Sequence, residues 1–309
     1  MNIITLTLNP AIDVHVRADS LIPNAHNVVE FSRRDPAGKG VNVSRALCAW
    51  GVDNLCYAVL GDDNGDEFAS ALRSEGIALK YFTAPGRIRE NVNVQHSEGE
   101  TVIAMRGIPL GREVVARVVD DLRSYINTET VLCFSGSLAD GTDKDAVLSA
   151  LFEFKRLGAR LVIDSRSLST EEIISLAPYL IKPNEDEALA LTGMSADTPK
   201  SAAKIAKALR DMGCDNVLVT LGGRGAALAS RDGVFAASSP KIEPISTVGA
   251  GDSTVAGFLA AESTGRAALA LAMAFGSAAC LTEGSTAPDP CQIKSLLQEI
   301  TVLDYSANM

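Results

Sequence analysis

The residues best suited to chemistry lie in the run Thr247-Val248-Gly249-Ala250-Gly251-Asp252. The pattern predicts a strand over residues 242–248, a Gly-Ala-Gly turn, and a helix that opens at Asp252. Glycines let backbone N–H groups approach a ligand, and a helix N-terminus adds free donors and partial positive charge, so the turn suits a phosphate. A carboxylate beside such a site suits proton abstraction from an attacking hydroxyl. The simpler alternative is that Asp252 only caps the helix.

A lysine between two glycines forms a second candidate site, Gly38-Lys39-Gly40, just before a helix predicted over residues 41–50. The spacing is not that of a Walker A loop, because no glycine lies five residues before Gly38. Lys39 and the following N–H groups could still bind an anion, and Asn42 could hold sugar hydroxyls. The alternative is a tight turn with Lys39 in solvent.

Asn184 and Glu187 form a third candidate, after a strand that ends near residue 181. They are three residues apart and share a helix face, and their oxygens suit Mg²⁺ held through water. The alternative is a capping box that only starts the helix. The run Thr220-Leu221-Gly222-Gly223-Arg224-Gly225 predicts a hairpin. The three histidines share no metal-ligand spacing and are expected on the surface or in a lid.

Composition narrows the function classes. The chain has 309 residues, a net charge of -10 and a pI near 4.9, which disfavours a nucleic-acid partner. The six cysteines form no C-x-x-C pair, so buried, reduced thiols in a cytoplasmic protein are expected. The N-terminus has no basic signal-peptide region. The longest uncharged apolar stretch, 267–281, is shorter than the roughly 20 residues of a membrane span and predicts a buried helix.

Strands and helices alternate along the chain, which predicts an α/β fold with a mostly parallel sheet. Expected strands lie at 3–8, 55–60, 131–135, 160–164 and 216–221, and expected helices at 41–50, 66–74, 143–157 and 202–212. The strands are apolar throughout, as in a sheet covered by helices on both faces. Two segments of mixed polarity, 13–34 and 87–106, break the pattern, and the second predicts a hairpin around Glu98-Gly99. They are expected to form strands outside the main sheet, as a lid.

The motifs together resemble the PfkB (ribokinase-like) carbohydrate kinase family, over nearly the whole chain. They are TLNPAID near residue 10, GKGVNVSRA near 40, SGS at 135–137, KPNEDE near 185, TLGGRG near 222 and TVGAGD near 250. The resemblance implies a three-layer α/β/α sandwich with a small β-sheet lid. The expected main domain covers 1–12, 35–86 and 107–309, and the lid 13–34 and 87–106. ATP as co-substrate, Mg²⁺ and a homodimer through the lid are implied as well.

The same resemblance implies a role for each matching residue. Asp252 is expected to be the catalytic base, with Gly249, Ala250 and Gly251 as the anion hole. The sugar and its existing phosphate are assigned to Asp13, Gly38, Lys39, Gly40, Asn42, Arg89 and Ser137. The nucleotide is assigned to Lys182, Asn184, Thr220, Gly222, Gly225 and Ser277, and the metal to Asn184 and Glu187.

The opening motif and the Gly-Lys-Gly loop are most similar to the phosphosugar branch of the family. The expected reaction is therefore ATP-dependent phosphorylation of a ketohexose phosphate, foremost fructose 1-phosphate to fructose 1,6-bisphosphate. Tagatose 6-phosphate and fructose 6-phosphate are alternative substrates. A ribokinase-type kinase of an unphosphorylated sugar or nucleoside is a second alternative, although Lys39 and Arg89 would then face a neutral sugar. A non-catalytic sugar-binding regulator is the alternative of another class.

Overall fold

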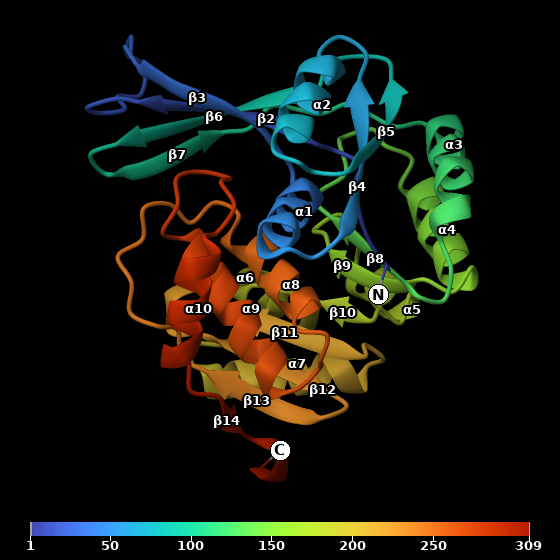
Figure 1. Cartoon of the computed structure of the whole chain (residues 1–309), viewed down its shortest axis with the longest axis vertical. Coiled ribbons are helices and arrows are strands. Elements are labelled where there is room, and N and C mark those ends of the chain that lie inside the picture. Colours follow the sequence, from blue (N-terminus) through green and yellow to red (C-terminus); the bar gives the residue numbers. More distant parts are fainter. Residues whose placement is uncertain (1, 309) are drawn as a thin grey trace.

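A ten-stranded sheet forms the centre of the computed structural model, which describes residues 2–308 (Figure 1). Seven neighbouring strands run parallel, and three antiparallel strands extend one edge. The order across the sheet is β14 (Leu303–Asp304), β13 (Gly233–Ala237), β12 (Ala226–Ser230), β11 (Asn216–Thr220), β10 (Leu180–Ile181), β9 (Arg160–Asp164), β8 (Thr130–Ser135), β1 (Asn2–Thr7), β4 (Asn54–Gly61) and β5 (Leu79–Ala84). The expected mostly parallel sheet is confirmed.

Helices cover both faces of this sheet, which confirms the three-layer α/β/α sandwich. One face packs against α3 (Arg112–Leu122), α4 (Lys144–Arg156), α5 (Thr170–Ser175), α6 (Glu185–Thr192) and α7 (Pro199–Asp211). The other packs against α1 (Lys39–Trp50), α2 (Gly65–Ser74), α8 (Ala250–Ala260), α9 (Arg266–Ala279) and α10 (Pro290–Glu299). Side chains alternate between the two faces of the sheet, as β1 illustrates: Ile3 points into one core, and Ile4 and Leu6 point into the other. The sheet therefore has a hydrophobic core on each face.

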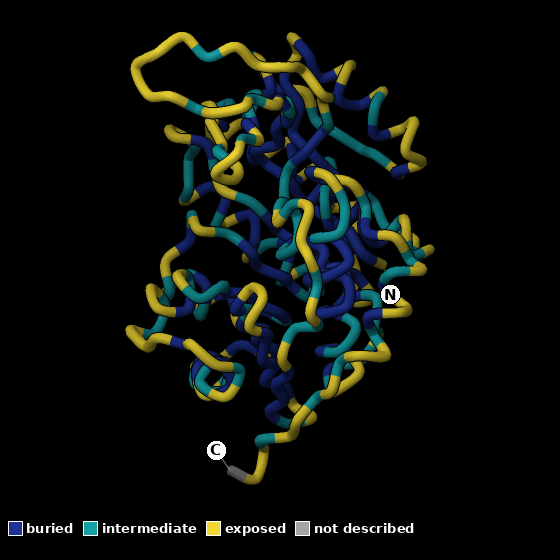
Figure 2. Tube along the Cα trace, turned by 90° about the vertical axis from the view of Figure 1, so that its left-hand side faces the viewer, coloured by how far each residue is buried: buried dark blue, intermediate teal, exposed yellow. Residues whose placement is uncertain are grey.

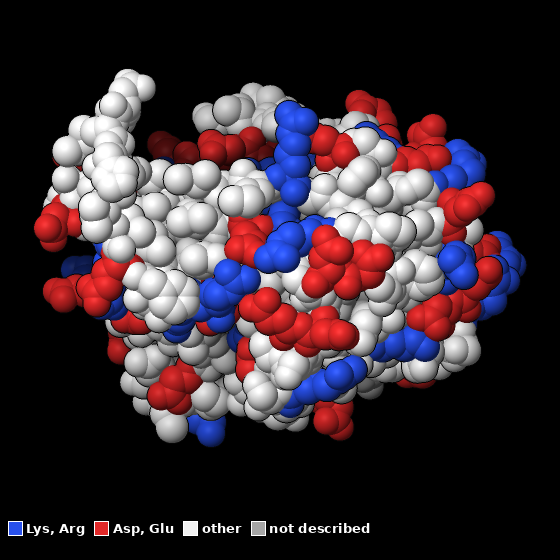
Figure 3. All heavy atoms as spheres, turned by 90° about the horizontal axis from the view of Figure 1, so that it is seen from above, with Lys and Arg blue, Asp and Glu red and all other residues white. Residues whose placement is uncertain are grey.

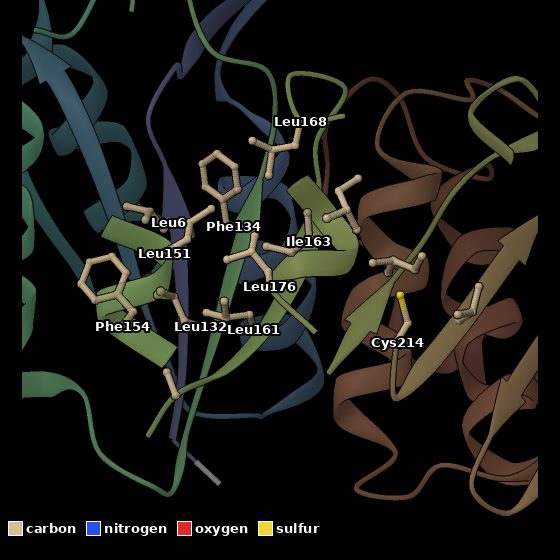
Figure 4. Packing of buried hydrophobic residues seen from close by; sticks show 14 of the residues in the cluster. Leu6, Leu132, Phe134, Leu151, Phe154, Leu161, Ile163, Leu168, Leu176 and Cys214 are labelled. Atoms are coloured by element: carbon tan, nitrogen blue, oxygen red, sulfur yellow. The ribbon is translucent and has the colours of Figure 1, made fainter. Parts of the chain in front are cut away.

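Figure 4 shows the larger core, where Leu6 and Phe134 from neighbouring strands lie near Leu151 and Phe154 of α4. The buried trace runs through the middle of the molecule in Figure 2, and exposed segments lie at its outside. Burial on both faces explains why the parallel strands are apolar throughout. This rigid body fixes the carboxyl ends of the strands, where polar side chains collect.

A separate four-stranded sheet projects from the main body in the order β3 (Glu30–Ala37), β2 (Ala11–Arg17), β6 (Arg89–His96) and β7 (Gly99–Ile103) (Figure 1). Strands β6 and β7 form the hairpin expected around Glu98-Gly99. Strand β3 leads directly into the Gly-Lys-Gly loop and α1, so the sheet is attached at the second candidate site. We propose that the chain divides into a lid, residues 13–34 and 87–106, and a main domain formed by the remaining residues.

Three expectations are wrong, two about secondary structure and one about the burial of the cysteines. Residues 242–248 form no strand and lie in an irregular segment, partly exposed and interrupted by Pro244, with the Ile245 N–H bonded to the Cys280 carbonyl. Helix α8 opens at Ala250, two residues before Asp252. Cys291 is exposed, whereas Cys56, Cys133 and Cys214 are buried free thiols.

Helix α9 lies where a buried helix was expected. Among residues 2–308, none of the helices combines the length and the apolar character that crossing a bilayer requires.

The contact between α8 and α9 depends on Gly257. A methyl group there would lie 2.7 Å from the Leu271 carbonyl oxygen and 2.8 Å from the Ala272 Cα. Overpacking a tight core contact costs about 1–3 kcal/mol, so we expect Gly257→Ala to lower the free energy of unfolding by that amount in urea denaturation. Gly223→Ala is the control, because its added methyl group meets nothing within 4 Å. Equal losses in the two variants would contradict this account of the helix contact.

Candidate active site

The carboxyl ends of β9, β10 and β11 meet the N-termini of α1, α6 and α8 at one edge of the sheet, where ligands bind in open α/β sheets. The Thr220 N–H donates to the Pro183 carbonyl (3.0 Å), which joins two of these ends. A cavity of about 440 Å³ opens here. Its lining includes Lys39, Lys182, Asn184, Glu187, Thr220, Gly222, Gly225, Gly249, Ala250, Gly251, Asp252 and Ser277. All residues assigned to catalysis, nucleotide and metal therefore line one cavity.

The N-terminus of α8 is open. Its N-cap is Gly249, held in the left-handed region at φ 74°, where a residue with a side chain would be strained. No side chain among the described residues caps this helix. Asp252 instead points its Oδ2 at the Nδ2 of Asn42, which donates a hydrogen bond of 2.8 Å. The reading of Asp252 as a simple cap is therefore wrong. Within residues 2–308, no side chain occupies the first-turn N–H groups, which suit an anion, and that of Ala250 makes only a long contact to the Thr247 carbonyl (3.4 Å).

Asp252 is a buried carboxyl group. Burial, together with the nearby carboxylate of Asp164, raises its pKa from 3.8 to about 7. Lys39, the Asn42 hydrogen bond and Lys182 act in the opposite direction and limit the rise. A carboxyl group that titrates near neutral pH can both accept and release a proton under physiological conditions.

A second buried carboxylate, Asp164 at the end of β9, lies between two lysines. Its Oδ1 accepts a hydrogen bond from the Lys39 ammonium (3.0 Å) and lies 3.8 Å from that of Lys182. Burial works to raise the pKa of Asp164, but the two lysines outweigh it, so the pKa is lowered and the group is ionised. Burial likewise opposes the charge of Lys39, and Asp164 and Asp252 outweigh it, so that its pKa is raised.

Sequence reasoning missed Asp164. Its only signal is an acidic residue at the end of an apolar strand, Leu161-Val162-Ile163-Asp164. The parallel sheet places that end beside the Gly-Lys-Gly loop and Lys182, which no local pattern reveals. Lys39 is ion-paired and partly buried, so the alternative that left it in solvent is wrong.

Asn184 and Glu187 form the capping box, since the Glu187 N–H donates to Asn184 Oδ1 (2.8 Å) and the Asn184 N–H donates to Glu187 Oε2 (3.0 Å). Arg166 donates to Glu187 Oε1 (2.8 Å). Burial works to raise the pKa of Glu187, but these donors outweigh it and the pKa is lowered. The capping box is therefore present, and it leaves lone pairs on the same oxygens, so a metal role for Asn184 and Glu187 stays a prediction.

No cluster of three acidic, histidine or cysteine ligands occurs within residues 2–308. Mg²⁺ rarely needs one, because it keeps several waters and binds one or two carboxylates plus substrate phosphates. The ionised Glu187, the amide oxygen of Asn184 and the unpartnered buried Oδ2 of Asp164 offer oxygens of this kind. The residues present fit a hydrated Mg²⁺ carried with a nucleotide.

The projecting sheet contributes further polar groups. Asp13 of β2 is buried, and its oxygens accept from Asn91 Nδ2 (2.9 Å) and from Ser285 Oγ (3.3 Å). Arg89 opens β6 and is paired in register with Ala11, two residues from Asp13. Burial lowers the pKa of Arg89, and Asp13 opposes this.

Arg89 has weak partners. Its Nη atoms make only long contacts to Asn91 Oδ1 (3.4 Å) and the Asn9 carbonyl (3.5 Å), and its Nε is buried with no partner. A partly buried guanidinium in this state is suited to receive an anion.

The loop residues differ in how closely the structure joins them to the cavity. Gly38 and Gly40 pack against Thr7 at the end of β1, where a methyl group on Gly40 would lie 2.4 Å from Thr7 Oγ1. Ser137 is exposed in the loop after β8 and is not among the residues that line the cavity. Its neighbour Gly136 lies next to Lys39.

Comparisons with known proteins find a matching family and similar chains. The model of a family described as pfkB family carbohydrate kinase matches residues 7–291. A 1-phosphofructokinase of Escherichia coli K12 is 32% identical over 256 residues, 82% of each chain. One of Bacillus subtilis is 30% identical over 258 residues, 84% of each. The structure of phosphofructokinase-2 from Escherichia coli, in complex with substrates and products, has a TM-score of 0.88 and 25% identity, covering 97% of this chain and 99% of that one.

The raised pKa of Asp252 predicts how stability depends on pH. The unfolded chain ionises this group near its ordinary pKa of 3.8, whereas the folded protein keeps it protonated up to about 7. Between these values the unfolded state binds fewer protons, so this group makes the folded protein less stable as pH rises. Asn cannot ionise. We therefore expect Asp252→Asn to gain stability relative to the wild type between pH 5 and pH 8, measured by urea unfolding at both. A difference that does not change with pH would contradict the assigned pKa.

Proposed function

Since the chain belongs to the pfkB family of carbohydrate kinases, we propose that it transfers the γ-phosphoryl group of ATP to a hydroxyl of a ketohexose phosphate. Fructose 1-phosphate is the leading substrate and fructose 1,6-bisphosphate the product, because relatives named 1-phosphofructokinase match more than four fifths of the chain. The observation that carries the proposal is the buried carboxylate of Asp252 beside the open N-terminus of α8.

In the proposed reaction Asp252 accepts the proton of the sugar hydroxyl. The hydroxyl oxygen forms a bond to the γ-phosphorus as the bond from phosphorus to the ADP oxygen breaks. The backbone N–H groups of the N-cap Gly249 and of Ala250 and Gly251 in the first turn stabilise charge on the transferring group. Lys182 supports them, because its ammonium lies against Gly251, 3.3 Å from where a methyl group would project.

We place ATP along the cavity lined by Thr220, Gly222, Gly225 and Ser277, with its phosphates toward Lys182. Kinases of this family use ATP with Mg²⁺, which neutralises charge on the phosphate oxygens when bound. Glu187 and Asn184 would hold the hydrated ion, and the Oδ2 of Asp164 offers a further oxygen.

We place the sugar at the opposite end, between the Gly38-Lys39-Gly40 loop and the projecting sheet. Asp13 and Asn42 would bind hydroxyls, while Arg89 would bind the existing phosphate. The Gly38 N-cap of α1 also carries no side-chain cap, so its N–H groups are free to assist. Ser137 is proposed on the family motif alone, because the structure leaves it exposed.

Two alternatives make different demands on Arg89 and Asp252. A kinase of an unphosphorylated sugar or nucleoside would leave Arg89 without an anion. A sugar-binding regulator without turnover would have no use for a buried carboxyl group that titrates near pH 7. Tagatose 6-phosphate and fructose 6-phosphate satisfy both residues. They differ from fructose 1-phosphate in carrying the phosphate on C6 instead of C1, and tagatose differs further in its configuration at C4.

The projecting sheet supports the proposed homodimer. Val28, Phe31, Val102 and Ile103 are exposed on or beside it, and exposed apolar side chains favour contact with another protein surface. Acidic and basic side chains are interspersed on the face seen in Figure 3, unlike a basic nucleic-acid surface. A cytoplasmic location is proposed from the buried free thiols.

The decisive test of function is ADP release with fructose 1-phosphate, fructose 6-phosphate, tagatose 6-phosphate, fructose and ribose. We expect the highest kcat/KM with fructose 1-phosphate and little turnover of the two unphosphorylated sugars. The matched control is Asp252→Asn, which keeps the side-chain shape but removes the proton acceptor. General-base catalysis contributes about 10²–10⁴ in rate, so kcat should fall at least that far. Near-normal turnover by this variant would contradict the mechanism.

Arg89→Ala tests recognition of the existing phosphate. Losing a hydrogen bond to a charged group costs roughly 1.5–3 kcal/mol, so we expect KM for the phosphosugar to rise about ten- to a hundredfold. KM for ATP should stay nearly unchanged. Arg87→Ala is the control, because Arg87 lies in the same segment but is exposed and paired with Glu90 (2.7 Å). An unaltered sugar KM in Arg89→Ala would assign the phosphate to other residues.

A further inference from the structure

Arg45 is a buried cation on α1 that none of the assigned roles uses. A guanidinium has five N–H donors, and the structure gives this one five contacts. Its Nε and Nη2 reach the two carboxylate oxygens of Glu75 (2.5 and 3.2 Å), and Nη2 also reaches the Pro36 carbonyl (2.6 Å). Its Nη1 reaches Asn42 Oδ1 (2.9 Å) and the Ser285 carbonyl (3.1 Å).

The contact to Asn42 fixes which way that amide points. A guanidinium only donates, so it must face the amide oxygen of Asn42. The amide nitrogen is then directed to the other side, where it donates to Asp252 (2.8 Å). Without Arg45, the amide could rotate away or present its oxygen to a protonated Asp252. Arg45 thus determines the donor that meets the proposed base, although it does not touch the base.

The remaining contacts join this orientation to the projecting sheet. Pro36 belongs to β3, and its carbonyl is held directly by Arg45. Ser285 lies in the loop between α9 and α10, and its hydroxyl donates to Asp13 of β2 (3.3 Å). Arg45 therefore bonds directly to β3 and is connected to β2 through Ser285. Helix α1 lies between α2, which supplies Glu75 as its C-cap, and α8, which carries Asp252 (Figure 1).

We propose that Arg45 is a positioning residue, which orients Asn42 toward Asp252 and makes this orientation depend on the seating of β3 and the 280–289 loop. The ion pair with Glu75 holds the guanidinium in place. A lysine could keep the charge near Glu75, but its ammonium is a compact point charge with three donors and cannot reproduce the planar fork. This inference rests on the proposed function for the role of Asp252 as base.

The test compares Arg45→Lys, Asn42→Ala and the double variant, using the sugar phosphate that the wild type phosphorylates best. We expect Arg45→Lys to lower kcat by about 10- to 100-fold, the size of one hydrogen bond to a charged group, with KM for ATP nearly unchanged. In the Asn42→Ala background the same substitution should change kcat less than about twofold, because residues that act through one another are not additive. Full, independent losses from the two substitutions would overturn the inference.

The matched control is Arg34→Lys. Arg34 also joins β3 to α2, through Glu67 (3.2 Å), and bonds Glu90 of β6 (3.1 Å), but it makes no contact with Asn42. An equal fall of kcat in Arg34→Lys would assign the effect to general loosening of the sheet and overturn the inference. If Arg45→Lys fails to fold, Glu75→Gln replaces it. That variant keeps one acceptor for the guanidinium, and we expect a smaller fall in kcat that again disappears in the Asn42→Ala background.

Neutron crystal structures of the same variants, which distinguish the amide nitrogen from the amide oxygen, give a result that does not depend on substrate. The contact between Asn42 Nδ2 and Asp252 Oδ2 should be lost in Arg45→Lys and kept in Arg34→Lys. An intact contact in Arg45→Lys would overturn the inference. A wild type that turns over none of the sugars would contradict the proposed function alone, and the contact would still decide whether Arg45 positions Asn42.

Discussion

Two buried carboxylates that share two lysines impose the main constraint on this structure. An ionised group in a protein interior is very costly unless it is paired and hydrogen-bonded. Asp164 meets that condition because Lys39 and Lys182 both lie beside it, while Asp252 has an amide as its hydrogen-bond partner. Lys39 begins α1 and Lys182 follows β10, so the fold must bring both segments to the end of β9. The two lysines lower the pKa of Asp164 and leave it ionised, whereas the pKa of Asp252 stays raised, to about 7.

The rest of the fold serves to hold this arrangement. Hydrophobic cores between the sheet and the helices on its two faces hold the ends of the strands in place. The close contact between α8 and α9 holds the helix that carries Asp252. The polar groups assigned to the sugar come mostly from the projecting sheet and the loop at its base. The rigid part therefore holds the charge balance, and the more exposed part holds the recognition groups, a common division between scaffold and binding elements.

Apolar strands and glycine turns are local patterns, so the sequence was sufficient for the parallel sheet and the β6–β7 hairpin. The three layers and most of the residues that line the cavity were expected from the family resemblance of the motifs. The sequence was insufficient where partners are distant in the chain. Asp164 is a single acidic residue at the end of a strand. The partners of Arg45 include Glu75, thirty residues away, and Ser285, so no local pattern reveals its contacts. The 242–248 segment is apolar enough for a strand, but Pro244 and the absence of a neighbouring strand keep it irregular.

The two ends of the site are encoded in different parts of the chain. The proposed sugar-binding residues, apart from Ser137, lie between Asp13 and Arg89, whereas the nucleotide residues and the base lie between Lys182 and Ser277. Among the described residues, Lys39 donates a hydrogen bond to Asp164 and Asn42 donates one to Asp252, and these two bonds join the sugar-binding residues to the base and its neighbouring carboxylate. Evolution could therefore exchange the acceptor by altering the first third of the gene, while the phosphoryl-transfer apparatus is inherited unchanged. Such modular encoding would let one ancestral kinase diversify over many sugars, provided that Lys39 and Asn42 are retained.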